Sequence, residues 1–330
     1  MLFAHIFKAR KESGFKFVCY LTRTPALQGA PVESDYFNGK VAAKSWAAAK
    51  GAQAWNYKAN PARRAPGRSY TQIHERSIMS KILGYIAYEG PSTIDGAPIV
   101  VIVNKIDTAS KNDKTGAIVQ TFIIRSDSAP MAALQTGADV SICGDCGHRP
   151  YLIKTGESEE PPCYVQVGKS VQSVFHAYKR GRYVKADPAT IARALADKVV
   201  RIGTYGDPFA APVRMWTQIT RYAAGTRGYS HQWDRADFDV AAWAPLVMAS
   251  ADNIDQAAKA NLLGMRVFRV SVGVDVQPGE AVCPASAEGG RRSTCAKCTL
   301  CSGTSIAARD IVIADHAAGH ARRVISIVSA

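Results

Sequence analysis

Cysteine is the residue type whose spacing in this sequence most clearly predicts chemistry. Seven of the eight cysteines fall into two sets. The first set consists of Cys143, Cys146 and Cys163, and the second of Cys283, Cys295, Cys298 and Cys301. A Cys-x2-Cys turn directs two thiolates at one centre, and tight cysteine sets in an intracellular α/β chain are more often metal ligands than disulfides. We therefore predict that both sets bind metal, while Cys19 stands alone and has no predicted role.

The second set contains four thiols, which is enough to close a metal site. Its last three members follow one another at Cys-x2-Cys spacing, and Cys283 supplies the fourth ligand. This spacing is typical of the [4Fe–4S] ligands of ferredoxins. The alternative is a zinc ion bound tetrahedrally by the same four thiolates. The spacing favours an iron–sulfur cluster over zinc at residues 283–301.

The first set has three thiols, so its fourth position decides what it can do. A [4Fe–4S] cluster held by three thiolates leaves one iron open, and an open iron can bind a small molecule. His148 lies two residues beyond Cys146 and is the alternative fourth ligand, as in a tetrahedral zinc site. With His148 bound, the site is closed and has no such function. The sequence leaves both alternatives open.

The elements that position these cysteines are predicted from Met79 onward. Apolar β-branched runs predict strands at 99–103, 118–125, 198–204, 228–232, 246–249, 265–272 and 311–314. Amphipathic stretches and caps predict helices at 130–136, 168–180, 188–197 and 212–224, and one more between an Asp252 cap and Gly264. Strands that alternate with helices indicate βαβ units, so we predict an α/β fold with a partial or complete (β/α) barrel.

Reactive loops of such a barrel lie at the carboxyl ends of its strands. Four loops are expected there, at 205–208, 231–233, 250–253 and 273–275. His231 is interpreted as a satisfied histidine at a strand end rather than as a substrate contact. The chain has no Ser/His/Asp order, no Gly-x4-Gly-Lys-Ser/Thr loop and no Gly-x-Gly-x-x-Gly fingerprint, so hydrolase, NTPase and simple dehydrogenase functions have no support.

We divide the 330 residues into four parts. Residues 1–78 form a basic N-terminal extension, flexible in part, with an Ala-rich helix near 41–55. Residues 79–140 form a β-hairpin region that leads into the core. Residues 141–282 form the barrel-like core with the first cysteine set, and residues 283–330 form the four-cysteine loop and the last strand.

Positive charge is concentrated in the N-terminal part. The chain has 41 Lys and Arg against 27 Asp and Glu, a formal net charge of +14. Residues 1–78 hold 13 of these cations and four of the acids, interleaved with aromatic side chains. This mixture suits single-stranded nucleic acid, so DNA or RNA is a predicted partner, with a solvated basic extension as the alternative. No apolar run could span a bilayer and no secretory signal is recognised, so we expect a cytoplasmic protein without a membrane partner.

Several motifs of the chain resemble those of a group of uncharacterised bacteriophage proteins that are themselves similar to radical S-adenosylmethionine (SAM) enzymes. The resemblance extends from Ala87 to about Cys301, roughly two thirds of the chain. The matching segments are Tyr88–Ser92, Asn112–Gly116, Ile142–Arg149, Cys163–Val165, Arg201–Pro208 and the second cysteine set. Residues 1–78 lie outside it.

The resemblance implies a radical SAM barrel with two [4Fe–4S] clusters. Cys143, Cys146 and Cys163 would hold a cluster whose open iron binds SAM, and the second set would hold an auxiliary cluster. Tyr205, Gly206, Asp207 and Pro208 take the place of the family's Gly-Gly-Glu-Pro-like turn, which contacts the SAM amino group. The family's usual motif is Cys-x3-Cys-x2-Cys, whereas here the three cysteines span 21 positions.

The sequence therefore predicts an iron–sulfur enzyme of radical SAM type, served by a reductant protein in the host cytoplasm and acting on a nucleotide or nucleic acid. Two non-catalytic functions are the alternatives. One is a nucleic-acid-binding protein whose fold is stabilised by iron–sulfur clusters or zinc. The other is an iron–sulfur electron-transfer protein. The oligomeric state is not predicted.

Overall fold

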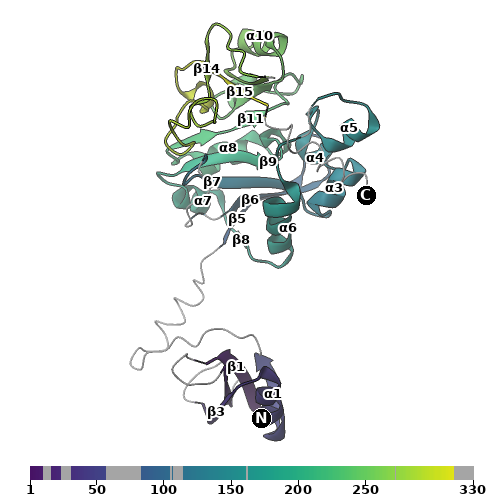
Figure 1. Ribbon diagram of the computed structural model, residues 1–330, viewed down its shortest axis with the longest axis vertical. Coiled ribbons are helices and arrows are strands. Elements are labelled where there is room, and N and C mark those ends of the chain that lie inside the picture. The colour runs from purple at the N-terminus through teal and green to yellow at the C-terminus, as the bar shows by residue number, and fades with distance from the viewer. Residues whose placement is uncertain are drawn as a thin grey trace. The chain divides into compact units, whose positions relative to one another are not determined.

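The computed structural model describes residues 1–9, 16–23, 31–56, 83–104, 106, 114–160, 163–271 and 273–315. The chain divides into two compact units, Met1–Ser80 and Lys81–Ala330. They are described separately below and drawn in Figure 1. None of the described helices has the length and apolar character that crossing a membrane requires.

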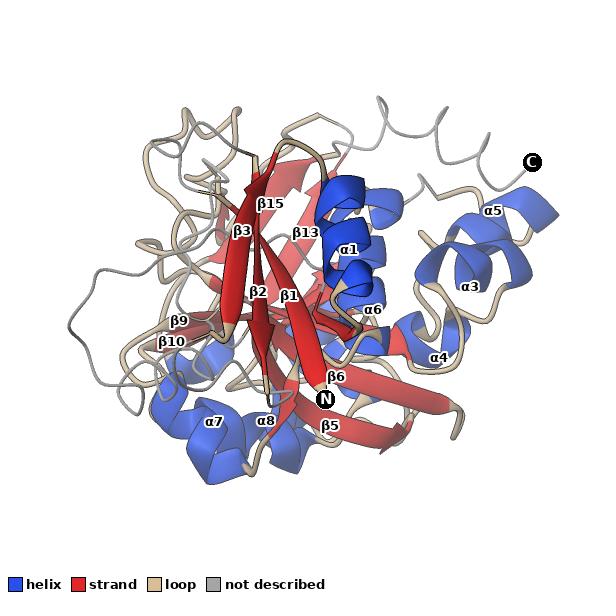
Figure 2. Cartoon of the chain, turned by 90° about the horizontal axis from the view of Figure 1, so that it is seen from below, coloured by secondary structure: helices blue, strands red, loops and turns tan. Residues whose placement is uncertain are grey.

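The N-terminal unit contains a four-stranded sheet with one helix. Its elements are β1 (Leu2–Lys8), β2 (Phe17–Thr22), β3 (Glu33–Phe37), α1 (Lys40–Ala49) and β4 (Ala52–Asn56). The strand order is β3-β2-β1-β4, with β1 antiparallel to β2 and parallel to β4. Ala43 and Ala47 of α1 pack against Ile6 and Leu21 of the sheet, and Figure 2 shows α1 lying beside β1.

This unit differs from the extension that the sequence predicts. The expected helix near 41–55 ends at Ala49, because Gly51 adopts a positive φ of 69° and the chain turns into β4. The sequence analysis did not predict this sheet, because its strands are short and separated by polar segments. Cys19 is fully buried among apolar side chains of this sheet, and burial raises the pKa of its thiol to about 11.

The larger unit contains two sheets, which confirms a mixed α/β fold. The first has the order β10-β9-β7-β6-β5-β8. Its strands are β5 (Gly84–Pro91), β6 (Pro98–Asn104), β7 (Val119–Arg125), β8 (Val184–Lys185), β9 (Val199–Tyr205) and β10 (Gly225–Arg227). Strands β5, β6 and β7 are antiparallel neighbours, whereas β7, β9 and β10 run parallel.

The second sheet is parallel throughout, in the order β11-β12-β13-β15-β14. Its strands are β11 (Tyr229–Ser230), β12 (Met248–Ala251), β13 (Val267–Ser271), β14 (Glu280–Val282) and β15 (Asp310–Ala314). Only Gly228 separates β10 from β11, and its carbonyl accepts a hydrogen bond from the Met248 amide. The predicted strand at 228–232 is therefore only the short β11, and β10, which belongs to the other sheet, was not predicted. No closed barrel is found among the described residues.

Helices cover the first sheet. α7 (Pro188–Ala194) and α8 (Val213–Thr220) lie side by side against it (Figure 2). Around the carboxyl end of β7 lie α3 (Pro130–Thr136), α4 (Val140–Cys143) and α5 (Pro150–Thr155) (Figure 1). The remaining helical segments are η2 (Val167–Val171), α6 (Gln172–Lys179), η3 (Pro208–Ala210), α9 (Val240–Trp243), α10 (Ile254–Leu262) and η4 (Gly303–Ser305).

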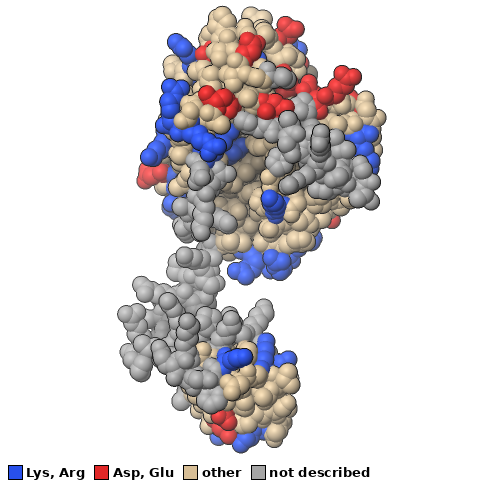
Figure 3. Space-filling view, viewed as in Figure 1, with Lys and Arg blue, Asp and Glu red and all other residues tan. Residues whose placement is uncertain are grey.

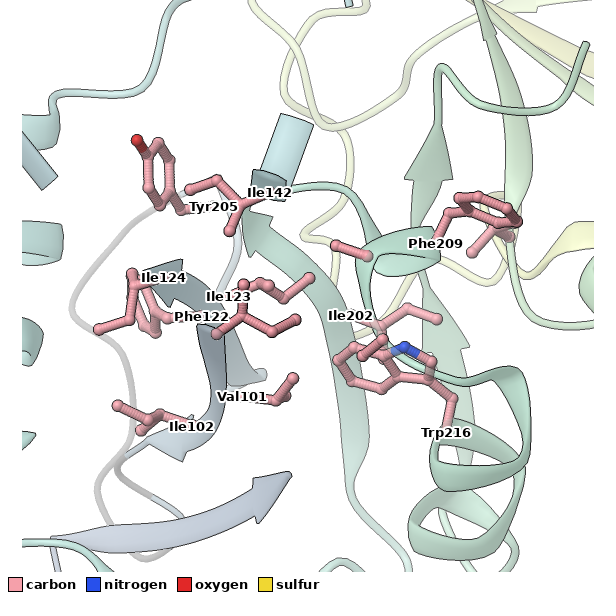
Figure 4. Close-up of a cluster of buried hydrophobic side chains, with 14 of the residues drawn as sticks. Val101, Ile102, Phe122, Ile123, Ile124, Ile142, Ile202, Tyr205, Phe209 and Trp216 are labelled. Carbon is pink, nitrogen blue, oxygen red and sulfur yellow. The ribbon is translucent and has the colours of Figure 1, made fainter. Parts of the chain in front are cut away.

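The core explains why these helices dock on the sheet. Strands β7 and β9 bury Phe122 and Ile202, and Trp216 of α8 is drawn beside Ile202 in Figure 4. The Trp216 indole also donates a hydrogen bond of 2.9 Å to the Pro208 carbonyl, which satisfies its one polar group. The end of β9 is thereby tied to α8.

One predicted cap is wrong, and the reason concerns the site. The helix after β12 is capped by Asn253, whose side chain accepts a hydrogen bond from the Gln256 amide. Asp252 instead accepts a hydrogen bond from a histidine of the first cysteine loop. The Asp252 carboxylate therefore makes a tertiary hydrogen bond instead of the helix cap that the sequence pattern predicted.

Candidate metal centre

Inward-facing residues of neighbouring parallel strands line one cavity of about 530 Å³ in the larger unit. Successive side chains of a strand point to opposite faces, so every second residue faces the same way. From β9 and the β10–β11 segment these residues are Arg201, Gly203, Tyr205, Arg227, Tyr229 and His231. From β13 and β15 they are Phe268, Val270, Ile311 and Ile313, which form an apolar wall.

All seven cysteines of the two predicted sets line this cavity, as free thiols. The sequence predicts two sets but contains no signal that they share a cavity. The first cysteine loop follows β7 and the second follows β14. Residues of β9 and of the β10–β11 segment line the cavity together with both loops. Within each set the thiols are close enough to act on one another's pKa.

The first cysteine loop is held by three polar contacts. The Cys163 amide donates to the His148 carbonyl at 2.8 Å, which brings the distant third cysteine to the Cys-x2-Cys pair. Arg149 forms a buried ion pair of 2.9 Å with Asp139 at the start of the loop. The Gln232 side chain, beyond β11, donates to the Cys143 carbonyl at 3.0 Å.

The second cysteine loop is organised around Arg227, which sequence analysis missed. Its Nε donates to the Cys298 carbonyl at 2.7 Å and to the Cys295 carbonyl at 3.3 Å. From the other side, the Cys295 amide donates to the Lys114 carbonyl at 3.0 Å. The end of the Asn112–Gly116 motif therefore supports the second cysteine loop, while Asn112 itself lies outside the described residues.

Burial controls the protonation of most of these thiols. Burial raises the pKa of Cys163 to about 11 and that of Cys301 to about 12, and raises that of Cys143 well above its usual value. Burial acts in the same direction on Cys146, but His231 and His148 outweigh it, so the pKa of Cys146 lies below its ordinary value. Metal binding to Cys143, Cys163 and Cys301 must therefore release protons.

Two histidines and a carboxylate meet beside Cys146. His148 Nε2 lies 2.9 Å from Asp252 Oδ1, and His231 Nε2 lies 3.5 Å from the same oxygen. Burial opposes the charged forms of both histidines, but the interactions with Asp252 and Cys146 are stronger and favour them. The pKa of His148 is therefore raised to about 9, and the pKa of His231 is raised well above its usual value. His148 thus faces Asp252, and His231 belongs to the site rather than being an isolated strand-end histidine. Asp252 lies in the expected loop 250–253, although the sequence pattern assigned its side chain to a helix cap.

The predicted SAM-contacting turn also has a structural role. Gly206 has a φ of 80°, and a Cβ there would lie 2.8 Å from Ile123 Cβ and 2.9 Å from the Ile123 carbonyl oxygen. The Asp207 amide donates to the Ile142 carbonyl at 2.6 Å, one residue before Cys143. The turn therefore clamps the end of β9 onto both β7 and the first cysteine loop.

The four residues of this turn differ in their access to the cavity. Tyr205, Gly206 and Asp207 line it, whereas Pro208 is buried outside the lining. The Asp207 carboxylate accepts hydrogen bonds from Ser230 Oγ, at 2.8 Å, and from the amides of His231, at 2.8 Å, and Phe209, at 3.0 Å. Burial raises the pKa of Asp207 even though these donors face it.

Three buried polar atoms of residues that line the cavity make no well-formed hydrogen bond among the described residues. They are Thr204 Oγ1, Tyr205 Oη and His231 Nε2. Buried polar atoms are nearly always satisfied, and exceptions indicate a ligand, an ion or water. Their positions at the ends of β9 and β11 indicate that a polar group binds between the two cysteine sets.

Cations line the cavity as well. Arg201 donates to the Tyr164 hydroxyl at 2.7 Å and has no ion pair with a carboxylate among the described residues. Lys114 is a second lining cation. On the face drawn in Figure 3, acidic side chains gather at the upper end of the larger unit and basic ones along one edge and its lower end. The cavity cations are candidates for binding an anion.

Comparison of the chain with family models, with curated proteins and with solved structures finds no match. Function must therefore be argued from the cavity itself.

Proposed function

We propose that this chain is an iron–sulfur enzyme of radical SAM type that acts on a nucleotide or a nucleic acid. The observation that carries the proposal is that seven cysteines and the Tyr205–Asp207 turn line one cavity. The unpartnered polar atoms at the ends of β9 and β11 support a bound molecule between the cysteine sets.

Sulfur spacing supports iron–sulfur clusters over zinc. Zinc–sulfur bonds of about 2.3 Å in a tetrahedron place the sulfurs about 3.8 Å apart. No three thiols within the described part of the chain lie within 4.8 Å of one another, although the four thiols of the second set interact electrostatically. A cuboidal cluster binds each thiolate to a different iron and so accepts wider spacing.

The strand order supports a partial barrel of the radical SAM kind. Strands β7, β9 and β10 are parallel, and β11, β12, β13 and β15 continue as a parallel series directly after Gly228. The first cysteine loop follows the first of these strands, and the Tyr205–Pro208 turn follows the second. This is the order of parts that the resemblance implies.

The cluster, when bound, supplies the electron for reductive cleavage of SAM. The chain's own part is to bind and orient. Asp207 Oδ2 accepts one internal hydrogen bond and retains a lone pair for the SAM ammonium group, and Gly206 lets the backbone approach closely. The hydroxyls of Thr204 and Tyr205 are available to further polar groups of the ligand.

Within this proposal a nucleotide is the favoured substrate. Lys114 and Arg201 offer charge to a phosphate inside the cavity, and the apolar wall with Phe268 offers a surface to a base. A reductant protein is needed as electron donor. Nucleic acid remains the substrate to be tested beside the nucleotide.

The proposal is tested by oxygen-free purification, followed by assay of iron, sulfide and zinc and by electron paramagnetic resonance with and without SAM. We expect about eight irons and eight sulfides per chain, the content of two [4Fe–4S] clusters, and a reduced spectrum that SAM perturbs. Cys298→Ala should remove one cluster's iron and leave the response to SAM, whereas Cys163→Ala should remove the response. Two zincs without sulfide would refute the proposal.

A second function, nucleic-acid binding without catalysis, is favoured by one observation. The residues Met1–Ser80 hold 13 of the 41 cations but four of the 27 acids. Salt-dependent binding of single-stranded DNA or RNA, together with a spectrum that SAM leaves unchanged, would support this function instead.

A further inference from the structure

The side chains of His148, His231 and Asp252 form a cluster next to Cys146. One ligand atom from each residue lies within 4.8 Å of the other two. Among the His, Cys, Asp and Glu side chains of the described residues, only these three form such a group. The three residues come from the first cysteine loop, the end of β11 and the end of β12. Segments far apart in sequence thus deliver two imidazoles and a carboxylate to one point.

The spacing of these atoms fits a metal ion. Metal–nitrogen bonds of about 2.0–2.1 Å and metal–oxygen bonds of about 2.0–2.2 Å, at a tetrahedral angle, place ligand atoms about 3.3 Å apart. The distances from Asp252 Oδ1 to the two imidazole nitrogens, 2.9 and 3.5 Å, lie on either side of that value. A small adjustment of the His148 and His231 rings is enough to surround an ion.

A second observation points the same way. His231 Nε2 is buried and makes no well-formed hydrogen bond among the described residues, since Asp252 Oδ1 lies 3.5 Å away and Cys146 is its other polar neighbour. The backbone around it is held firmly, because the His231 amide donates to Asp207 and the Asp252 amide donates to Gln256 Oε1 at 2.7 Å. Fixed backbone with an unsatisfied side-chain nitrogen is typical of a site that is organised for a ligand.

We propose that His148, His231 and Asp252 bind one divalent transition-metal ion, separate from the cysteine-bound metal. Two imidazoles and one carboxylate are the donor set of catalytic zinc and of non-haem iron sites, in which open positions remain for water or substrate. Both histidines line the cavity, so the open positions of the ion face the space between the two cysteine sets. The site does not require Cys146, which stays with the first cysteine set.

The ion would act on an anionic or hydroxyl-bearing molecule in the cavity. Its open positions lie in the same cavity as Arg201, so the ion and the guanidinium can share one oxygen-rich group. This assignment is independent of whether the cysteines carry iron–sulfur clusters, because none of the three ligands is a thiol.

Zinc binding by the full chain tests the proposal. Zn²⁺ alone is added to anaerobically purified protein, unbound ion is removed by desalting, and zinc, iron and sulfide are counted. His231→Gln and Asp252→Asn are compared with two matched exposed controls, His176→Gln of α6 and Asp255→Asn of α10. We expect His231→Gln and Asp252→Asn to bind one zinc fewer than the wild type, and the controls to match it.

The outcomes separate this site from the cysteine sites. Equal zinc in wild type, His231→Gln and Asp252→Asn would overturn the proposal, whatever the sulfide content. Absence of sulfide would overturn the proposed function and leave the one-zinc difference intact. Both variants are near-isosteric, and thermal melts identify any that fails to fold, in which case His148→Gln provides the same comparison.

Discussion

Asp207 combines two roles in one carboxylate. It faces the cavity, and it also accepts hydrogen bonds from Ser230 and from the amides of Phe209 and His231. A buried donor left without its acceptor destabilises a protein by about 1–3 kcal/mol. Removing this carboxylate must therefore affect both the fold and any ligand that it contacts.

Asp207→Ala is expected to abolish SAM binding and to lower the free energy of unfolding by at least about 2 kcal/mol, because three donors lose their acceptor. Urea unfolding and titration with SAM measure the two effects. Asp187→Ala is the matched control, since Asp187 is an exposed cap of α7 that accepts from the Thr190 amide. It should reduce stability by about 1 kcal/mol and leave SAM binding unchanged. Unchanged SAM binding in Asp207→Ala would contradict the role given to Asp207.

At the scale of elements, the turn after β9 and the ion pair between β13 and β14, the two neighbours of β15, decide whether the site is assembled. The turn depends on Gly206, which has no room for a Cβ against Ile123. The second cysteine loop follows β14, whose Glu280 forms a buried ion pair of 2.7 Å with Arg269 of β13. Each contact joins a segment that carries cysteines to the parallel strands.

Gly206→Ala is expected to destabilise the protein by more than the roughly 1–2 kcal/mol that a left-handed conformation alone costs. Its Cβ would also displace β7, which carries the first cysteine loop, so iron content should fall. Gly156→Ala is the control, because Gly156 has a φ of 79° but no atom within 4 Å of the position that a Cβ would occupy. Equal unfolding free energies for the two variants would show that the close approach to Ile123 is unimportant.

Glu280→Gln is expected to lower the free energy of unfolding by about 3–5 kcal/mol near neutral pH, because it leaves Arg269 buried without its partner. Burial opposes ionisation of Glu280, but Arg269 and the Gln277 amide outweigh it and hold the pKa of Glu280 below its ordinary value. A lowered pKa stabilises the fold above the unfolded value of about 4.3 and ceases to do so as pH falls through the folded pKa.

The difference between wild type and Glu280→Gln should therefore shrink as the pH falls from the unfolded pKa of about 4.3 through the lower folded pKa of Glu280. Urea unfolding at several pH values measures it. Asp234→Asn removes an exposed partner of Lys259 and should change stability by less than about 1 kcal/mol at any of these pH values. A difference that grows on acidification would contradict a lowered pKa of Glu280 in the folded protein.

At the scale of the whole molecule, most of the positive charge excess and the two cysteine sets lie in different units. The cysteines of both sets belong to Lys81–Ala330, whereas Met1–Ser80 carries a formal excess of nine positive charges out of the total of 14. The N-terminal unit has its own sheet and its own buried cluster around Ile6 and Leu21. The division allows binding and chemistry to be tested separately.

A chain of residues 81–330 is expected to keep the iron and sulfide content of the full protein and its spectral response to SAM. It should lose most of the salt-dependent affinity for a short single-stranded oligonucleotide, because the released counterions scale with the cations that contact phosphates. Fluorescence anisotropy at several salt concentrations measures this. An unchanged salt slope would place the nucleic-acid contacts in the larger unit.

Local features of this protein could be predicted from its amino-acid sequence. Cysteine spacing selected the seven thiols, and the apolar runs of β6, β7, β9 and β13 were recognised to within two residues, because both signals lie within a few neighbouring positions. The α/β class followed from the alternation of elements. The sheet of the N-terminal unit was missed, because short strands between polar segments leave little periodic signal.

The composition of the site, in contrast, depends on the folded chain. Arg227 and Asp252 belong to it although neither stands in a motif, and the two cysteine sets share a cavity although more than 100 residues separate them. These relations depend on which parallel strands are neighbours, and strand pairing joins residues without regard to their distance in sequence. Asp252 is an example. Its position in the sequence is typical of a helix cap, but its carboxylate accepts a hydrogen bond from His148, because the end of β12 lies against the first cysteine loop.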